Sequence, residues 1–191
     1  DPALERPDIQ LHFVVSVVDD HARKLHLGYG YSCHICVLRP ASRGSVTLAS
    51  ADPMAAPTID PNFLAQDSDL TTLIKGAKMA REIMKTPPLA AYEHKELFGV
   101  RDGMTDADWA NVIRARADTI YHPVGTCKMG VDDSAVVDPR LRVHGVQGLR
   151  VVDASVMPSV TSGNTNAPTI MIAEGAADLI KADAAQPAAA A

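Results

Sequence analysis

The chain has 191 residues, of which 47% are hydrophobic and 21% charged, as in a globular protein and unlike a disordered one. Its formal net charge is −5 and its pI is near 5.7, so the basic surplus of nucleic-acid-binding domains is absent. No apolar run reaches the roughly 18–20 residues that span a bilayer. We therefore expect one globular domain, or parts of two, with no nucleic-acid partner and no transmembrane segment.

The first half of the sequence begins with strand-like segments. Residues 9–18 alternate between apolar and polar side chains, which predicts a half-buried strand. Residues 29–38 and 45–48 predict two more strands, and the short turns between the three favour one antiparallel sheet. The proline-punctuated stretch 50–64 predicts a loop.

A helix is predicted over residues 67–85, because its apolar positions recur at the spacing of one helical face. Asp67 or Ser68 can cap its N-terminus, and Pro87 and Pro88 are expected to stop it.

A second helix is predicted over residues 106–118, with Thr105 as the N-cap and Asp108 completing a capping box. Further along, residues 149–152 predict one strand and residues 168–181 a final helix.

The chain has three cysteines, Cys33, Cys36 and Cys127, too few and too irregularly spaced for a disulfide framework. Free thiols in a reducing compartment are the simplest interpretation. Cys33 and Cys36 lie three residues apart on a predicted strand and so point to opposite faces, which argues against a metal site.

Two segments of the second half carry candidate chemistry. The first places His122 between tyrosine and proline in a glycine-bearing loop, which can aim a side chain into a cavity. The second, residues 151–169, places a strand end, an acidic residue and a run of Asn and Thr before a predicted helix. A helix N-terminus offers unpaired N–H groups and partial positive charge, which suit an anion or an electron-rich ring edge.

Each of these residues, taken alone, also has a simpler interpretation. His122 can be a surface or core residue, and Asn164 can occupy a left-handed turn. Asp153 can cap a strand end, and Asn166 can cap a helix.

Long motifs favour the functional interpretation. They follow one another as His122-Pro123-x-Gly125-Thr126-Cys127-x-Met129-Gly130, Val137-Asp138-Pro139-x-Leu141-x-Val143-x-Gly145, Leu149-Arg150-Val151-Val152-Asp153-Ala154-Ser155 and Gly163-Asn164-x-Asn166-Ala167-Pro168-Thr169. Upstream lie Leu38-Arg39-Pro40-x-Ser42-Arg43-Gly44 and Pro57-x-Ile59-Asp60-Pro61-Asn62. Over about residues 9 to 181 the sequence resembles the C-terminal part of the FAD-dependent glucose–methanol–choline (GMC) oxidoreductases, and most closely their bacterial alcohol and choline dehydrogenase-like members.

The resemblance implies an α+β fold. Residues 1–118 would form part of a substrate-binding domain, an antiparallel sheet with flanking helices. Residues 119–181 would hold the catalytic loop and the C-terminal strand and helix that return to an FAD-binding α/β domain. Residues 182–191, rich in Ala and Pro, are expected to form a disordered tail.

The resemblance also implies the oxidation of a primary alcohol to an aldehyde. His122 would be the general base on the substrate hydroxyl, and Asn164 would hydrogen-bond the substrate oxygen while hydride passes to the flavin. The implied cofactor contacts are Asp153 and Ala154 along the ribityl and diphosphate region, and Asn166, Ala167 and Thr169 at the pyrimidine edge.

No Gly-x-Gly-x-x-Gly motif follows a strand, so the ADP-cradling part of a flavin site is not in this chain. We therefore expect it to act with an N-terminal FAD-binding part of the same protein. A quinone or oxygen would accept the electrons, in a cytoplasmic enzyme with or without peripheral attachment to the inner membrane. Two alternatives stay open, a flavin-containing hydroxynitrile lyase of the same fold and an inactive fragment.

Overall fold

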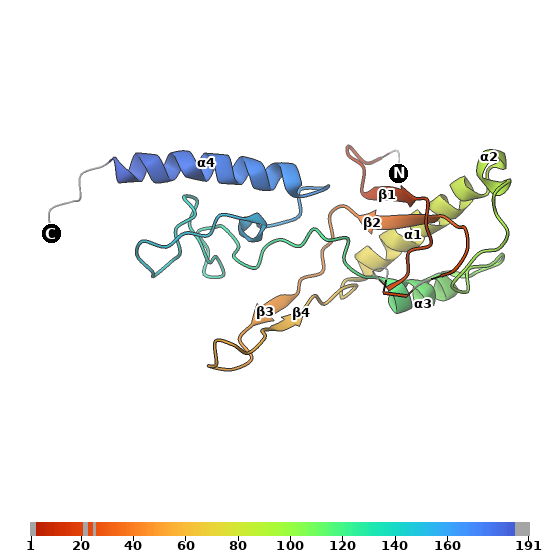
Figure 1. Ribbon diagram of the computed structural model, residues 1–191, viewed down its shortest axis with the longest axis horizontal. Helices are drawn as coiled ribbons and strands as arrows, with labels where there is room; N and C mark the ends of the chain where they lie inside the picture. Colours follow the sequence, from red (N-terminus) through yellow and green to blue (C-terminus); the bar gives the residue numbers. More distant parts are fainter. Residues whose placement is uncertain (1–2, 21–22, 25, 186–191) are drawn as a thin grey trace. The chain divides into compact units, whose positions relative to one another are not determined.

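The computed structural model describes residues 3–20, 23–24 and 26–185. The chain divides into two compact units, Asp1–Ile120 and Tyr121–Ala191 (Figure 1). The fold is mixed α+β, with small antiparallel sheets and helices, as the sequence predicts.

The first unit contains all the regular strands of the described residues and three helices. The elements are β1 (Ile9–Val14), β2 (Ser32–Val37), β3 (Ser45–Thr47), β4 (Thr58–Asp60), α1 (Asp67–Met84), α2 (Pro87–Ala90) and α3 (Asp106–Arg116). The second unit contains the short 3-10 helix η2 (Ala154–Val156) and the long helix α4 (Asn166–Ala184).

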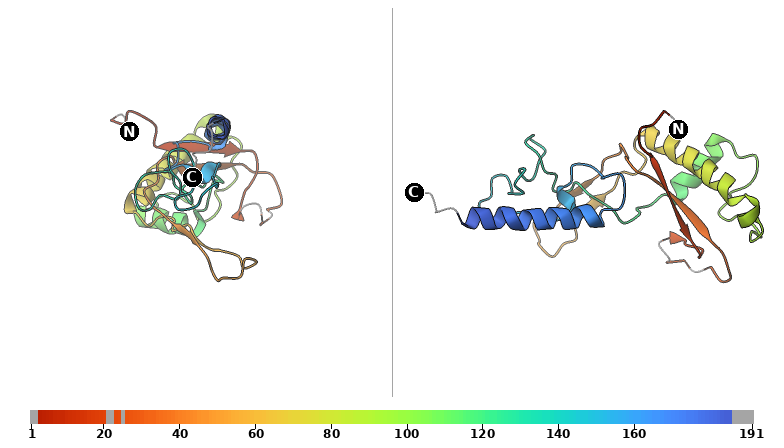
Figure 2. Two further views of the ribbon diagram at one scale, coloured as in Figure 1. Left: turned by 90° about the vertical axis from the view of Figure 1, so that its left-hand side faces the viewer. Right: turned by 90° about the horizontal axis from the view of Figure 1, so that it is seen from above.

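Strands β1 and β2 form an antiparallel ribbon, with Ile9 opposite Val37 and Phe13 opposite Cys33. Helix α1 lies against this ribbon in both views of Figure 2. Gly76 of α1 makes this approach possible, because a Cβ there would lie 2.7 Å from Cγ2 of Ile35. β1 is shorter than the expected strand over residues 9–18, since it ends at Val14.

The expected three-stranded sheet is wrong. β3 pairs with β4, inside the stretch expected to be a loop, and Val46 lies opposite Ile59. The pairing is possible because Gly44 lets the two arms close, since a Cβ there would lie 2.1 Å from the carbonyl oxygen of Asp60. This strand has only three residues and lies between two prolines, so the sequence pattern did not reveal it.

Helix α1 buries the predicted face, with Leu70 9% and Ala80 3% exposed. Its N-cap is Gln66 and makes no side-chain cap hydrogen bond, so neither Asp67 nor Ser68 is the cap. Both lie instead inside the first turn, where the acidic charge of Asp67 complements the helix dipole.

The two prolines that were expected only to stop α1 also begin α2, because a proline ring fixes the backbone angle that a first helical turn needs. The predicted capping box of α3 is confirmed. The Thr105 hydroxyl accepts from the Asp108 amide at 3.2 Å, and the Asp108 carboxylate accepts from the Thr105 amide at 2.9 Å. α3 ends at Arg116, two residues before the predicted end.

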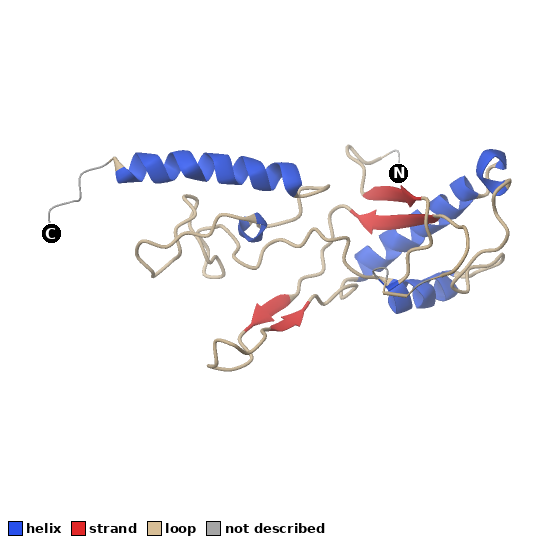
Figure 3. Ribbon diagram, viewed as in Figure 1, coloured by secondary structure: helices blue, strands red, loops and turns tan. Residues whose placement is uncertain are grey.

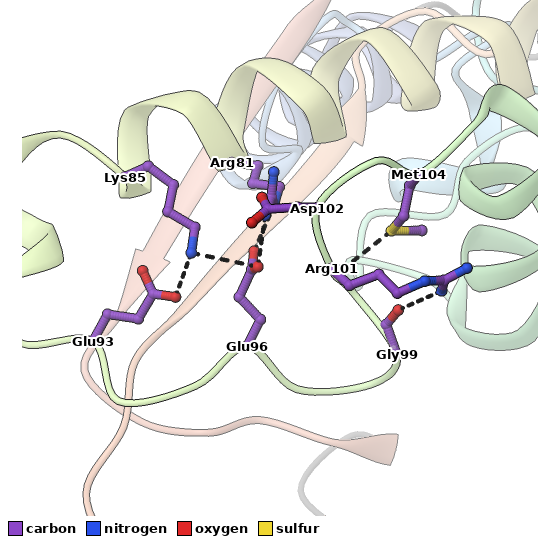
Figure 4. Close-up of polar contacts among 8 residues, drawn as sticks. All are labelled: Arg81, Lys85, Glu93, Glu96, Gly99, Arg101, Asp102 and Met104. Carbon is purple, nitrogen blue, oxygen red and sulfur yellow. Dashed lines mark hydrogen bonds and ion pairs between the residues drawn. The ribbon is translucent and has the colours of Figure 1, made fainter.

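A charge cluster fixes the segment between α2 and α3 to α1 (Figure 4). Arg81 binds Glu96 through two hydrogen bonds of 2.6 and 2.7 Å and also reaches Asp102 at 2.5 Å. Lys85 pairs with Glu93 at 2.6 Å. The Arg81 hydrogen bond holds the pKa of Glu96 below its usual value, so the cluster keeps its charges at neutral pH.

The second unit is mostly loop around a small core (Figure 3). Val137, Leu141, Val156 and Ala176 are its buried apolar side chains. The strand expected over residues 149–152 is not formed. Its pairing is limited to a single β-bridge between Arg150 and Arg142, which is too short to make a strand.

Helix α4 is longer at both ends than the predicted residues 168–181. Near its C-terminal end, Asp183 binds both Arg140 and Arg150, which tie the helix to the preceding loop. Residues 182–184 are therefore helical and Ala185 is the C-cap of α4, while the other residues of the expected tail, 186–191, lie outside the described residues.

Asp69 links the start of α1 to the base of the β3–β4 hairpin. Its side chain accepts hydrogen bonds from the amides of Ala41 and Ser42, at 2.9 and 2.8 Å, and from the Ser42 hydroxyl at 2.6 Å. Burial alone would raise the pKa of this carboxyl group, but these hydrogen bonds outweigh it and lower the pKa.

We predict that Asp69→Asn lowers the free energy of unfolding by about 1–3 kcal/mol at neutral pH, because one amide group cannot accept all three bonds. The folded-state pKa lies below the unfolded value of about 3.9, so the stabilisation is complete above that pH and is lost as pH falls through the lower value. Thermal unfolding of the full-length protein from pH 7 to pH 3 measures this. The melting temperatures of variant and wild type should converge in acid, and a constant gap would contradict the charge-based account.

Candidate active site

The loop that carries His122 lies beside the segment that follows Asp153. The amide of Cys127 donates to the carbonyl of Ser155 at 3.0 Å, and the amide of Met129 donates to the carbonyl of Val156 at 2.8 Å. Val156 is fully buried, so these two bonds fasten the loop to the core of the second unit. The two segments singled out in the sequence are thereby held side by side.

Gly125 shapes the same loop. Its φ is +89°, a backbone conformation that side chains with a Cβ rarely adopt. A Cβ at this position would lie 3.4 Å from the carbonyl oxygen of Met157, an ordinary contact. The glycine is therefore needed for its backbone angle and not for space.

The structure brings His122 and Asn164 together. Nδ2 of Asn164 lies 2.8 Å from Nε2 of His122, although the residues are 42 positions apart in the chain. His122 is half-buried and Asn164 is exposed, so a small molecule can reach both groups. An imidazole nitrogen and an amide N–H at this separation can serve one oxygen atom, the first as a proton acceptor and the second as a hydrogen-bond donor.

Left-handed backbone precedes both side chains. Tyr121, directly before His122, has a φ of +68°, and Ser162, two residues before Asn164, has a φ of +64°. Non-glycine residues seldom adopt such angles, and they cluster at functional sites where the surrounding structure enforces them. These two bends direct the chain so that the imidazole and the amide meet.

Thr165 is a third member of the site that sequence reasoning missed. Its hydroxyl oxygen lies 3.1 Å from Nδ1 of His122, and its backbone amide lies 3.5 Å from the same nitrogen. Thr165 is only 8% exposed. It stands in the unassigned position of the Gly163-Asn164-x-Asn166 motif, and a hydroxyl next to Asn164 was the only signal available.

The residues expected at the pyrimidine edge of a flavin begin helix α4. Asn166 is the first helical residue and not the cap, since Thr165 occupies the N-cap position. Asn166 and Ala167 are exposed, and the hydroxyl of Thr169 donates to the Thr165 carbonyl at 2.6 Å. The first amides of a helix have no partner within it, so this end can bind an electron-rich edge.

Asp153 and Ala154 lie at the start of the short helix η2. The Asp153 carboxylate accepts from the Ser155 amide at 2.7 Å and so caps η2. Asp153 is exposed and Ala154 half-buried. A capping role is therefore present, and it leaves the exposed carboxylate accessible to further hydrogen-bond donors.

The three cysteines lie apart from one another in bonding terms, each as a free thiol. Cys33, Cys36 and Cys127 are free thiols, and Sγ of Cys36 lies 3.6 Å from Nε2 of His12 across the β1–β2 ribbon. Among residues 3–20, 23–24 and 26–185, no three His, Cys, Asp or Glu side chains are grouped as metal ligands would be. Within the described part of the chain, no helix combines the length and apolar character that crossing a bilayer requires.

Comparison with known families shows to which protein family the chain belongs. The profile of the family described as GMC oxidoreductase matches residues 40–173, which is most of the chain and includes His122 and Asn164. The chain therefore belongs to the GMC oxidoreductases.

Relatives support this assignment. The chain is 50% identical over 179 residues to an alcohol dehydrogenase [acceptor] of Pseudomonas putida, covering 94% of this chain and 32% of the relative. It is 47% identical over 182 residues to the mitochondrial choline dehydrogenase of Homo sapiens, covering 94% of this chain and 31% of the relative. The chain thus spans about a third of the length of these relatives.

Solved structures agree in fold. Pyridoxine 4-oxidase from Mesorbium loti superposes with a TM-score of 0.83 at 31% identity, over 93% of this chain and 35% of that one. Formate oxidase from Aspergillus oryzae superposes with a TM-score of 0.84 at 30% identity, over 94% and 32%. Members of the family depend on FAD, and two of the similar solved structures are described with it, the formate oxidase and an FAD-dependent oxidoreductase from Chaetomium thermophilum.

We predict that Gly125→Ala destabilises the protein by about 1–2 kcal/mol, because alanine must adopt a left-handed backbone there. Gly125→Asn is the matched comparison, since asparagine tolerates this conformation better than alanine although it is larger. Thermal unfolding of both variants in the full-length protein should place the asparagine variant closer to wild type. A lower melting temperature for asparagine than for alanine would show that crowding, and not the backbone angle, demands glycine.

Proposed function

We propose that the full-length protein containing this chain is an FAD-dependent dehydrogenase or oxidase of primary alcohols, in which His122 is the general base and Asn164 binds the substrate oxygen. The observation that carries the proposal is the 2.8 Å separation of the His122 and Asn164 nitrogens. An oxygen atom placed about 2.9 Å from each would complete a nearly equilateral triangle, so both groups can bind it at ordinary hydrogen-bond lengths. One hydroxyl group can therefore donate its proton to Nε2 and accept the amide N–H, which then turns from Nε2 to the substrate oxygen.

The different proposed roles of His122 and Asn164 follow from the chemistry of their side chains. A neutral imidazole can take the hydroxyl proton near neutral pH, and the alkoxide character that develops on the oxygen is stabilised by the Asn164 amide. The amide carries no charge and does not titrate, so it does not compete for the proton. FAD, when bound, supplies the acceptor for the hydride that leaves the carbinol carbon, and the product is an aldehyde.

The start of α4 is the proposed contact for the flavin ring. Asn166 and Ala167 are exposed at the partially positive end of a 19-residue helix, directly after Asn164, and Thr169 lies in the same first turn. Asp153 and Ala154 are the proposed contacts along the ribityl and diphosphate region. Small and polar exposed side chains in these places suit the close approach of a flat polar cofactor.

The proposed partner of this chain is the N-terminal FAD-binding part of the same protein. The relatives are about three times as long as the chain, and the phosphate-binding glycine motif is not within it. Ile170 is 54% and Met171 67% exposed, directly after Thr169, the last of the proposed flavin contacts on α4. Large apolar side chains exposed next to each other indicate a surface that another part of the protein covers.

The substrate class rests on the relatives. The similar proteins from Pseudomonas putida and Homo sapiens are an alcohol dehydrogenase and a choline dehydrogenase, and both substrates carry a CH–OH group. The proposed electron acceptor is a quinone or oxygen. An anaerobic panel of ethanol, 1-butanol, 1-octanol and choline, added to the full-length holoprotein, tests the proposal through loss of the oxidised flavin absorbance. No reduction by any of them would overturn it, and cleavage of a cyanohydrin without flavin bleaching would indicate a lyase instead.

We predict that His122→Ala retains bound flavin and slows its reduction by the best alcohol of the panel by about 10²-fold or more, because the proton acceptor is lost. Stopped-flow absorbance of the anaerobic protein measures the rate, and the flavin-to-protein ratio serves as the control. An unchanged rate would remove His122 from this role.

We predict that Asn164→Ala lowers the limiting rate of flavin reduction by about 10²-fold, the usual effect of removing a donor to a developing oxyanion. Asn164→His is the matched variant, because it keeps an N–H donor near the same oxygen, and it should retain more activity than alanine. Equal losses in the two variants would mean that the donor function of this side chain is not what matters.

A further inference from the structure

We propose that Thr165 is the positioning residue of the site: its hydroxyl accepts the Nδ1 proton of His122 and so keeps Nε2 unprotonated and ready to act as the base. The inference rests on the proposed function of His122 and deepens it. The Thr165 hydroxyl lies 3.1 Å from Nδ1 of His122, so its effect on catalysis is expected to pass through the imidazole.

The side-chain contacts of the two ring nitrogens are compatible with one and the same tautomer. Nε2 of His122 faces Nδ2 of Asn164 at 2.8 Å, and an amide nitrogen can only donate. Nε2 must therefore be an acceptor, and a neutral imidazole then carries its proton on Nδ1. The Thr165 hydroxyl oxygen, 3.1 Å from Nδ1, is in place to accept that proton.

The backbone amide of Thr165 acts in the opposite direction. It lies 3.5 Å from Nδ1 and can donate only to an unprotonated nitrogen, which favours the tautomer with the proton on Nε2. In that tautomer His122 cannot take a proton from a substrate hydroxyl. The Asn164 N–H at Nε2 selects the tautomer with the proton on Nδ1, and the Thr165 hydroxyl, the shorter of the two contacts at Nδ1, then accepts that proton.

Helix α4 lacks a side-chain capping hydrogen bond, because the Thr165 hydroxyl contacts His122 instead. Thr165 is the N-cap of α4, and threonine at an N-cap usually accepts a hydrogen bond from an amide of the first turn. Here the side chain makes no cap hydrogen bond and is directed to His122 instead. With only 8% of the residue exposed, the hydroxyl is shielded from competing water.

The test compares Thr165→Val with Thr165→Ser in the full-length holoprotein. Valine keeps the shape and the backbone amide but removes the hydroxyl, while serine keeps the hydroxyl. With 1-butanol and choline as probes, stopped-flow measurements give the limiting rate of flavin reduction and the apparent dissociation constant of the alcohol. We expect valine to lower the limiting rate about 10-fold, the effect of losing one neutral hydrogen bond to the base, and to change the dissociation constant less than about 3-fold.

Serine should restore the limiting rate to within about 3-fold of wild type. Thr71→Val is the remote control, because the Thr71 hydroxyl donates to the Asp67 carbonyl at 2.8 Å within α1, and it should leave the rate unchanged. A valine variant with wild-type limiting rate, or a serine variant as slow as valine, would overturn the proposal. A change confined to the dissociation constant would do the same, because it would make Thr165 a substrate contact.

The ring protons give a readout that does not depend on turnover. In protein labelled with ¹⁵N-histidine, the signals lost on His122→Gln belong to His122, and their nitrogen shifts report which nitrogen carries the proton. We expect Nδ1–H in wild type and a shift toward Nε2–H in Thr165→Val. If His122→Ala slows flavin reduction but Thr165→Val changes neither rate nor tautomer, the inference fails while the proposed function stands. If His122→Ala reacts normally, the proposed function itself fails.

Discussion

The site depends on the hydrogen bonds that hold both nitrogens of one imidazole. Nε2 of His122 faces Asn164 and Nδ1 faces Thr165, so the position of the ring is set by two consecutive residues at the start of α4. That start is in turn fixed by the packing of Ala176, in the middle of α4, against the buried core of the second unit. A shift of the helix would therefore move the amide of Asn164 and the hydroxyl of Thr165 together relative to His122, which lies on a separate loop held to Ser155 and Val156.

Most of the second unit is held by individual backbone hydrogen bonds between loops and not by helices or strands. Backbone bonds from Cys127 and Met129 to the segment at Ser155 and Val156 hold the loop that carries His122, where no strand runs. Loops of this kind allow backbone angles that a helix or strand forbids, and Tyr121 uses such an angle directly before His122. In the first unit a charged side chain holds a loop in place: the buried carboxylate of Asp69 accepts three hydrogen bonds at the base of the β3–β4 hairpin.

Features with strong local signals could be predicted from the sequence. The apolar spacing of α1 and the Thr105–Asp108 capping box were found because each depends on residues within one or two helical turns. The β3–β4 pairing was missed because β4 has three residues, too few for an alternation to be recognised. His122 and Asn164 were identified through long motifs, but Thr165 was not, because its role depends on a ring 43 positions away that no local pattern reveals. The residue order alone also could not indicate that residues 149–152 lack a strand partner.

The ion pairs of Asp183 with Arg140 and Arg150 give the far end of α4 an influence on chemistry at its near end. At about 1.5 Å per residue, the 19-residue helix spans about 28 Å, so Asp183 acts as a distant anchor for the turn that presents Asn164 and Thr165. Both arginines belong to the loop between His122 and η2, so contacts link the two ends of α4 through this loop. Truncation before Asp183 would remove both ion pairs and release this end of α4 from the loop that carries the two arginines.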